Sequence, residues 1–238
     1  MKFSLLIKTI RESKKPLLAI LIDPDKFNLD LIKLANHCSV FCFLVGGSIL
    51  EKGNVKTTVL TIKKYSNIPV ILFPGDETQL TKEADGLFLP SLISGTNPDY
   101  LITKQLLMTP LIKKMKLESV PMAYLLINNS YVSSTHKITK TKPLNPKNKK
   151  EIINIAITAE LMGFKLIYLE AGSGSKNSIS NALSKQIKLK TSLPILVGGG
   201  IDSVKKANHA ISSGVNLIVI GNALEKNISL LNKISLLF

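Results

Sequence analysis

The sequence predicts an α/β fold, a (β/α)8 barrel of the TIM type, and two observations support this prediction. Short apolar runs alternate with amphipathic stretches along almost the whole chain. Several of the apolar runs end in an acid, a hydroxyl or a glycine. In a parallel barrel these ends meet on one face, where barrel enzymes place their active sites. The length of 238 residues suits a single barrel domain over residues 1–238.

The chain begins with a stretch, Met1–Lys15, in which lysines and acids interrupt short apolar pairs. It lacks the continuous apolar core of a secretion signal, so we expect a helix that closes the bottom of the barrel, and a cytoplasmic location. No apolar run approaches the roughly 18 residues that a membrane-spanning helix needs. The sequence therefore predicts no transmembrane segment.

Eight apolar runs are the expected strands, and most are followed by an amphipathic stretch. The strands are expected at Leu17–Asp23, Val40–Gly46, Pro69–Phe73, Gly86–Pro90, Met122–Asn128, Leu166–Glu170, Ile195–Gly198 and Leu217–Ile220. The helices are expected at Leu29–Asn36, Val55–Tyr65, Pro98–Lys114, Lys147–Leu161, Ser178–Lys188, Val204–Ser212 and Ala223–Leu231. The segment after the third strand, residues 76–84, is short and is bracketed by Gly75 and Gly86. We therefore expect the third helix to be irregular or missing.

The formal net charge is +15. A positive charge of this size is typical of proteins that bind a nucleic acid, an anionic lipid surface or an anionic substrate, and it does not distinguish among these partners. Most of the lysines are scattered, as on an ordinary solvated surface. The exception is Lys137–Lys150, with six lysines, two prolines and no acid, where we expect a long mobile loop. No zinc-finger spacing or aromatic RNA-binding pattern accompanies it, so we expect no nucleic-acid partner.

Glycines close the last two expected strands, at Gly198-Gly199-Gly200 and at Gly221-Asn222. Barrels commonly bind phosphate between these two loops, because glycine lets backbone N–H groups approach an anion. The run Gly172-Ser173-Gly174 after the sixth strand adds a third wall of the same kind. Glu170 ends that strand, and a carboxylate there is costly unless it has a partner or a chemical role. The sequence therefore predicts a phosphate site beside a carboxylate that acts in the reaction or pairs with a lysine.

Asp23 and Ser48 lie at the ends of the first two expected strands and offer two oxygen ligands across the barrel mouth. Mg²⁺ accepts so sparse a set when phosphates and waters fill its other positions. Asp25 and Lys26, in the same turn, fit equally well as ordinary turn and cap residues. We expect a magnesium site at Asp23 and Ser48.

These motifs together resemble the geranylgeranylglyceryl phosphate synthases and their heptaprenyl relatives, over essentially the whole chain. The resemblance is carried by six motifs in order: Leu21-Ile22-Asp23-Pro24-Asp25-Lys26, Val45-Gly46-Gly47-Ser48, Pro90-Ser91, Tyr168-Leu169-Glu170-Ala171-Gly172-Ser173-Gly174, Val197-Gly198-Gly199-Gly200-Ile201 and Ile220-Gly221-Asn222-Ala223. One branch of the family carries a lysine two residues before the metal aspartate. That position is Leu21 here, which places the chain in the other branch and leaves open which cation replaces the lysine.

The resemblance implies a Mg²⁺-dependent prenyltransferase of ether phospholipid biosynthesis. It would join sn-glycerol 1-phosphate to an all-trans polyprenyl diphosphate, such as geranylgeranyl diphosphate, and release diphosphate. The implied metal ligands are Asp23 and Ser48. The implied glycerol-phosphate contacts are Tyr168, Leu169, Glu170, Ala171, Gly172, Ser173, Gly174, Gly199, Gly200, Gly221 and Asn222. The resemblance also implies a missing third helix, a homodimer or homohexamer, and a chain-length limit at Met108; we further expect transient contact with a membrane surface.

The mechanism follows as a hypothesis, in which Glu170 takes the hydroxyl proton of the acceptor and Tyr168 orients it. Three alternatives stay open. A sugar-phosphate isomerase, epimerase or lyase would use the same phosphate loops without the metal pair. A basic RNA-binding or membrane-surface protein would bind in a salt-sensitive manner without turnover. A barrel that has kept its phosphate site but lost its activity is the third.

Overall fold

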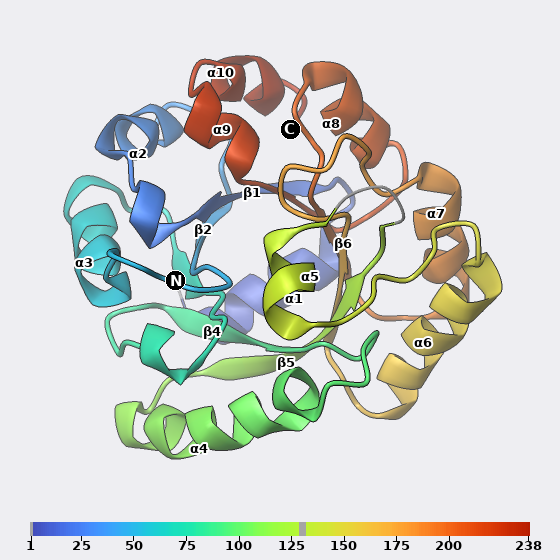
Figure 1. Cartoon of the computed structure of the whole chain (residues 1–238). Helices are drawn as coiled ribbons and strands as arrows, with labels where there is room; N and C mark the ends of the chain where they lie inside the picture. The colour runs from blue at the N-terminus through green and yellow to red at the C-terminus, as the bar shows by residue number, and fades with distance from the viewer. Residues whose placement is uncertain (1, 129–131) are drawn as a thin grey trace.

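The computed structural model describes residues 2–128 and 132–238, and eight parallel strands close into a barrel in their sequence order (Figure 1). This confirms the predicted (β/α)8 architecture. The strands are β1 (Leu17–Ile22), β2 (Cys42–Val45), β3 (Val70–Leu72), β4 (Gly86–Ser91), β5 (Ser119–Leu126), β6 (Leu166–Glu170), β7 (Ile195–Gly198) and β8 (Leu217–Ile220). The pairing of Leu17 with Leu217 is part of the β1–β8 ladder that closes the ring.

Two hydrophobic cores follow from the alternation of side chains along each strand. In β6, Ile167 and Leu169 point outward and pack beneath the helices, whereas Leu166 and Tyr168 point into the barrel. The inner core also contains Cys42, whose thiol is free and fully buried. Because both faces of every strand are covered, the strands read as nearly continuous apolar runs.

The helices surround the barrel and most start at a side-chain cap (Figure 1). Asn28, Asn54, Asn148, Ser180 and Ser203 each accept a backbone N–H in the first turn of the helix that follows. The helices of the outer layer are α2 (Leu29–Ala35), α3 (Val55–Tyr65), α4 (Lys104–Met115), α6 (Lys149–Leu161), α7 (Asn181–Lys190), α8 (Val204–Ile211), α9 (Asn222–Lys226) and α10 (Leu230–Ser235).

No α-helix follows β3 in the described chain. Its place is taken by a single 3-10 turn, η2 (Glu77–Gln79), after which the chain enters β4. The expectation of an irregular or missing third helix is therefore confirmed. The segment is too short for a full helix, and Asp76 caps the turn by accepting the N–H of Thr78.

The first helix, α1 (Phe3–Glu12), lies behind the barrel in Figure 1, across the amino ends of the strands. Its buried side chains Phe3, Leu6 and Ile10 belong to the inner core. The ring of Phe3 lies against Gly86, the first residue of β4, and Asn216 before β8 donates to the carbonyl of Ile10 at 2.9 Å. The predicted helix at the bottom of the barrel is thus confirmed.

Two expected helices differ in detail, and one helix was not expected. The helix expected at Pro98–Lys114 begins with a π-helical turn, η3 (Asp99–Thr103), before α4. The helix expected at Ala223–Leu231 is two helices, α9 and α10, because Asn227 has an extended conformation (φ −151°) and its side chain accepts the N–H of Ser229. Ser133 begins the short helix α5 (Ser134–Thr139), which has no counterpart among the expected elements.

The lysine-rich segment at 137–150, where a long mobile loop was expected, includes the end of α5 and the start of α6 and is anchored to the barrel between them. Leu144 is buried and exchanges backbone hydrogen bonds with Leu126 and Asn128 at the end of β5. Thr141 is also buried, and the carbonyl of Thr139 accepts from Asn97 at 2.7 Å. The apolar and hydroxyl residues between the lysines explain this anchoring, whereas the lysines themselves remain at the surface.

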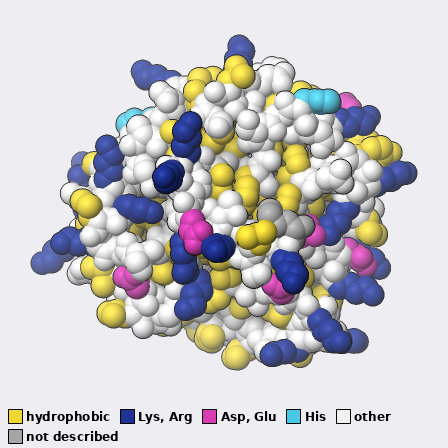
Figure 2. Space-filling model, turned by 180° about the vertical axis from the view of Figure 1, so that it is seen from behind, with side chains coloured by type: hydrophobic (Ala, Val, Ile, Leu, Met, Phe, Trp, Pro, Cys, Tyr) yellow, Lys and Arg dark blue, Asp and Glu magenta, His cyan; other side chains and the backbone are white. Residues whose placement is uncertain are grey.

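Figure 2 shows the face that carries α1, with lysine and arginine side chains spread around it and acids among some of them. The positive charge on this face is therefore dispersed, as the scattered lysines predicted. None of the helices in the described ranges is long and apolar enough to cross a membrane.

Candidate active site at the carboxyl ends of the strands

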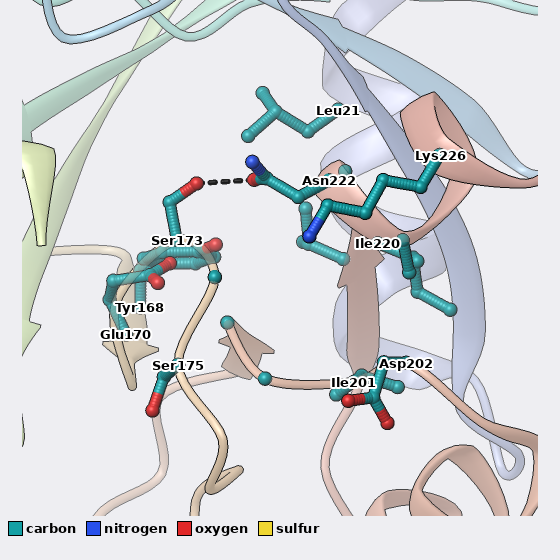
Figure 3. A pocket seen from close by; sticks show the side chains of 16 residues that line it. Leu21, Tyr168, Glu170, Ser173, Ser175, Ile201, Asp202, Ile220, Asn222 and Lys226 are labelled. Carbon is teal, nitrogen blue, oxygen red and sulfur yellow. Dashed lines mark hydrogen bonds between the residues drawn. The ribbon is translucent and has the colours of Figure 1, made fainter. Parts of the chain in front are cut away.

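A pocket of about 120 Å³ opens at the carboxyl ends of β6, β7 and β8 (Figure 3). The loops that line it are those in which the sequence predicted a phosphate site. Of the predicted residues, eight line it: Tyr168, Glu170, Ser173, Gly174, Gly199, Gly200, Gly221 and Asn222. Leu21 and Lys226 also contribute to the wall, and neither was predicted to do so.

Glu170 ends β6 with its side chain inside the barrel mouth, only 7% exposed. Its Oε1 accepts the N–H of Gly172 at 2.7 Å, and the Tyr168 hydroxyl donates to the same carboxylate. Burial raises the pKa of Glu170, and the two hydrogen bonds only partly oppose this. The partners that the sequence required for this buried carboxylate are therefore a tyrosine hydroxyl and a backbone N–H group, and not a lysine.

Tyr168 is 1% exposed, and burial raises the pKa of its hydroxyl well above the usual value. Its ring packs edge-on against Phe73, with centroids 5.2 Å apart, and lies at the same distance from the ring of Tyr124. A proton on the Tyr168 hydroxyl is thus retained at any ordinary pH. The group can donate one hydrogen bond, and in this structure it donates to Glu170.

Glycine at 198 and 199 lets β7 approach these two side chains. A Cβ on Gly198 would collide with the Tyr168 hydroxyl, and one on Gly199 would collide with Glu170 Oε1. Gly199 and Gly200 also have positive φ, +77° and +68°, a conformation that favours glycine. The glycine run is therefore required by the site geometry as well as by the turn.

Ser173 and Asn222 join the loop after β6 to the start of α9. The Ser173 hydroxyl donates a short hydrogen bond to Asn222 Oδ1, drawn as the dashed line in Figure 3. Two of the predicted walls are thereby held together across the pocket.

Three predicted contacts do not line the pocket. Leu169 and Ala171 belong to the outer core, because their side chains point toward the helices. Gly172 lies behind the wall, near Ser133 and Asn128, where it donates to Glu170. These residues shape the loop through their backbone, and their predicted contacts with glycerol phosphate stay predictions.

Asp23 lies at the end of β1, next to the loop that follows β2. Its Oδ1 lies 3.5 Å from the point where a Cβ on Gly47 would be, and Gly47 precedes Ser48. Oδ2 lies 3.5 Å from Lys26 Nζ, which also pairs with Glu225 at 3.2 Å. Burial lowers the pKa of Lys26, but the two carboxylates outweigh it and the net direction is upward.

The oxygen donors of Asp23 and Ser48 suit a hard cation that takes most of its ligands from water and substrate. Among the residues that the structure describes, no group of three or more His, Cys, Asp or Glu could enclose a metal. One carboxylate and one hydroxyl are what Mg²⁺ needs from a protein when waters and substrate phosphates complete its shell. The residues present therefore fit magnesium better than a structural metal.

Asp25 is a structural residue, which resolves the choice that its sequence left open. Its Oδ2 accepts the N–H of Glu51 at 2.8 Å, and its Oδ1 accepts those of Lys52, at 2.8 Å, and Gly53. These three backbone bonds hold the pKa of Asp25 below its usual value. The loop that carries Ser48 is thus fixed at one end.

Gln79, in η2, is a site residue that the sequence analysis missed. It is 1% exposed and bonds to the backbone of both Gly47 and Gly75. No sequence pattern marks a lone glutamine in a short turn. Met108, by contrast, is 1% exposed on the buried face of α4, in the outer core, and its role in chain length stays a prediction.

A closed parallel barrel whose glycine-lined pocket lies at the carboxyl ends of β6, β7 and β8 has the architecture of the (β/α)8 barrels that bind phosphate at this position. The family model described as "PcrB family" matches residues 8–235. The chain belongs to the PcrB family.

The curated relatives are similar over nearly their whole length. A geranylgeranylglyceryl phosphate synthase of Flavobacterium johnsoniae is 40% identical over 225 residues, which is 92% of this chain and 93% of the relative. The enzyme of the same name from Spirosoma linguale is 36% identical over 235 residues, 97% and 94% of the two chains.

A solved structure of (S)-3-O-geranylgeranylglyceryl phosphate synthase from Thermoplasma acidophilum, in complex with its substrate sn-glycerol-1-phosphate, matches with a TM-score of 0.90. It is 25% identical, and the match covers 100% of this chain and 98% of that one. The barrel of the present chain is thus similar throughout to one that holds glycerol phosphate.

Proposed function

We propose that this protein is a prenyltransferase that forms an ether bond between sn-glycerol 1-phosphate and an all-trans polyprenyl diphosphate, releasing diphosphate. The observation that carries the proposal is the pocket walled by Ser173, Gly199 and Asn222, in a chain of the PcrB family. The relatives named as geranylgeranylglyceryl phosphate synthases and the glycerol-phosphate complex support this choice of substrate.

The acceptor phosphate would lie between the loops after β6, β7 and β8. Backbone N–H groups of glycine residues can approach a phosphate there, because no Cβ stands in the way. The glycerol hydroxyl would then point toward Glu170, whose carboxylate ends β6 on the same pocket wall. The glycine loops would thus hold the phosphate end of the acceptor, and Glu170 would hold its hydroxyl end.

Mg²⁺ would be held by Asp23 and Ser48, and when bound it supplies positive charge to the leaving diphosphate. The two residues lie on the loops after β1 and β2, adjacent strands whose register pairs Ile22 with Val45. The prenyl diphosphate would thus enter from the β1–β2 side and the acceptor from the β6–β8 side.

Glu170 would act as the general base. As the bond between the allylic carbon and the diphosphate oxygen breaks, the glycerol oxygen bonds to that carbon and its proton passes to Glu170. The raised pKa of Glu170 suits a group that must accept a proton. Tyr168, through its bond to the same carboxylate, would hold the base in position.

The proposal includes a homo-oligomer of two or six chains, a cytoplasmic location and transient contact with the membrane that takes up the product. Apolar side chains on one helical segment, Ile102, Leu106 and Leu107, are about half exposed or more, which supports a covered surface in the assembly. Light scattering of the purified protein tests the oligomer.

The function is tested by incubating the protein with radiolabelled sn-glycerol 1-phosphate and a series of all-trans polyprenyl diphosphates of increasing length. The expected product is an ether lipid that forms with Mg²⁺, disappears with a chelator and forms from the sn-1 isomer alone. The donor that reacts fastest identifies the chain length, and substitution of Met108 by a smaller residue tests its assigned limit.

Absence of product with every donor would contradict the proposal. Turnover of a sugar phosphate without any prenyl donor would favour the isomerase, epimerase or lyase alternative instead.

A further inference from the structure

Lys226 is the one cationic side chain among the described residues that line the pocket. It ends α9, just after the Gly221-Asn222 loop, and is exposed to solvent. In Figure 3 its side chain extends from that helix over the pocket, with the nitrogen toward the side on which Ser173 and Asn222 lie.

Lys226 has no partner of its own in the described part of the chain. None of the ion pairs found there includes it, and no hydrogen bond of its ammonium group is found. By contrast, Lys26, a few residues past Leu21, is engaged by both Asp23 and Glu225. Of these two lysines near the barrel mouth, Lys226 is the one whose charge is available to a ligand.

The charges of the pocket call for such a cation. Two carboxylates line it, Glu170 and Asp202, and both would repel a phosphate. Asp202 is paired with Lys206 at 2.8 Å, which offsets its charge, but Glu170 has no cationic partner among the residues that the structure describes. Backbone N–H groups bring only partial charges, and a phosphate monoester carries nearly two negative charges at neutral pH.

We infer that Lys226 is a substrate-binding residue whose ammonium group pairs with the phosphate of the acceptor. It supplies positive charge to the part of the pocket wall where Leu21 is apolar. Leu21 packs against Gly221, with 3.3 Å between its Cβ and the point where a Cβ on that glycine would be. The apolar side chain on β1 and the lysine on α9 thus face the same end of the pocket. This inference rests on the proposed function, because it assigns a contact to its acceptor.

The test compares Lys226→Met, which keeps the length of the side chain and removes its charge, with Lys226→Arg, which keeps the charge. Lys233→Met on α10 is the matched control, since Lys233 is exposed and outside the pocket. Binding of sn-glycerol 1-phosphate and of inorganic diphosphate is measured by calorimetry at two salt concentrations.

Loss of a charged hydrogen bond predicts that Lys226→Met weakens glycerol 1-phosphate binding by about tenfold. Its binding should also depend less on salt than that of the wild type, because one ionic contact is gone. Lys226→Arg and Lys233→Met should bind nearly as the wild type does. The affinity for diphosphate should be unchanged in all of them, since its proposed site lies at Asp23 and Ser48.

Two outcomes would overturn the inference. Unchanged glycerol 1-phosphate binding in Lys226→Met would remove Lys226 from the acceptor site, and weakened binding of diphosphate alone would assign it to the donor. Either result leaves the proposed function standing if the wild type makes the ether lipid. A wild type that neither binds glycerol 1-phosphate nor makes product would refute the function itself.

Discussion

The side-chain amide of Gln79 and the backbone of Gly47 form a reciprocal pair of hydrogen bonds. Gln79 Nε2 donates to the Gly47 carbonyl at 2.8 Å, and Gln79 Oε1 accepts the Gly47 N–H at 3.0 Å. The same oxygen accepts the N–H of Gly75 at 3.2 Å. A buried side chain from the turn that replaces the third helix thus satisfies backbone groups as a neighbouring strand would, and it fixes the loop that carries Ser48.

Substitution of Gln79 by Leu should therefore lower the stability by about 2–4 kcal/mol, because three backbone groups lose their partner in a buried site. The change should also lower the apparent affinity for Mg²⁺, because Ser48 directly follows Gly47, whose backbone would no longer be held by Gln79. Urea unfolding and Mg²⁺ titration of the turnover rate measure the two effects. Gln186→Leu, at an exposed position of α7, is the control and should change neither.

Substitution of Glu170 by Gln should lower turnover by about 10²–10⁴-fold, the usual contribution of a general base. The amide side chain keeps an acceptor for the Gly172 N–H and has a similar volume, so the affinity for glycerol 1-phosphate should change little. Steady-state kinetics and calorimetry separate the two quantities. Glu12→Gln, at an exposed position of α1, is the control. An unchanged turnover rate in Glu170→Gln would remove Glu170 from the mechanism.

The pH dependence follows from the raised pKa of Glu170. A base must be ionised, so turnover should rise with pH and level off only above the ordinary value of 4.5 for a glutamate. A carboxyl with a raised pKa in the folded state costs stability once the pH exceeds its unfolded pKa. Glu170→Gln should therefore have a higher Tm than the wild type at neutral pH, and this difference should vanish below about pH 4.

Asp25 shows the opposite sign. Its pKa is lowered by the N–H groups of Glu51, Gly53 and Lys52, so its contribution to stability is present above its ordinary value of 3.8 and is lost as the pH falls below it. Asp25→Asn should lower the Tm at pH 7 and have a smaller effect in acid. Thermal melts across this pH range measure it, with Asp99→Asn as a control at an exposed position. An effect independent of pH would contradict the assignment.

The sequence predicted the barrel and eight of the residues that line the pocket, because both depend on local patterns. Apolar runs specify strands wherever both faces are buried, and glycine runs specify where backbone approaches a ligand or another side chain. Gln79 could not be predicted in this way, because its partners Gly47 and Gly75 come together only when the loops after β2 and β3 meet.

The same limit applies to Lys226. It is one of many lysines in a strongly basic chain, and it ends α9 directly before the break at Asn227 that separates α9 from α10. The expected helix Ala223–Leu231 ran through that break. A continuous amphipathic pattern concealed the asparagine turn, whose own side chain provides the bonds that end the helix.

Gly199 provides the sharpest test of the pocket geometry. A Cβ at this position would collide with Glu170 Oε1 and would lie 2.7 Å from the Gly172 nitrogen, the donor that holds the same carboxylate. Gly199→Ala should therefore displace Glu170 and abolish most turnover, with glycerol 1-phosphate bound about tenfold more weakly or worse. Stability should fall as well, because φ of +77° is strained for alanine.

Gly214→Ala separates these causes, because Gly214 has nearly the same φ, +74°, but no atom within 4 Å of where its Cβ would lie. It should lose about 1–2 kcal/mol from backbone strain alone and keep both turnover and acceptor binding. Equal losses of activity in the two variants would show that strain, and not the contact with Glu170, decides the result. Loss of activity in Gly199→Ala alone, at matched stability, would establish that β7 must approach the Glu170 carboxylate for the site to work.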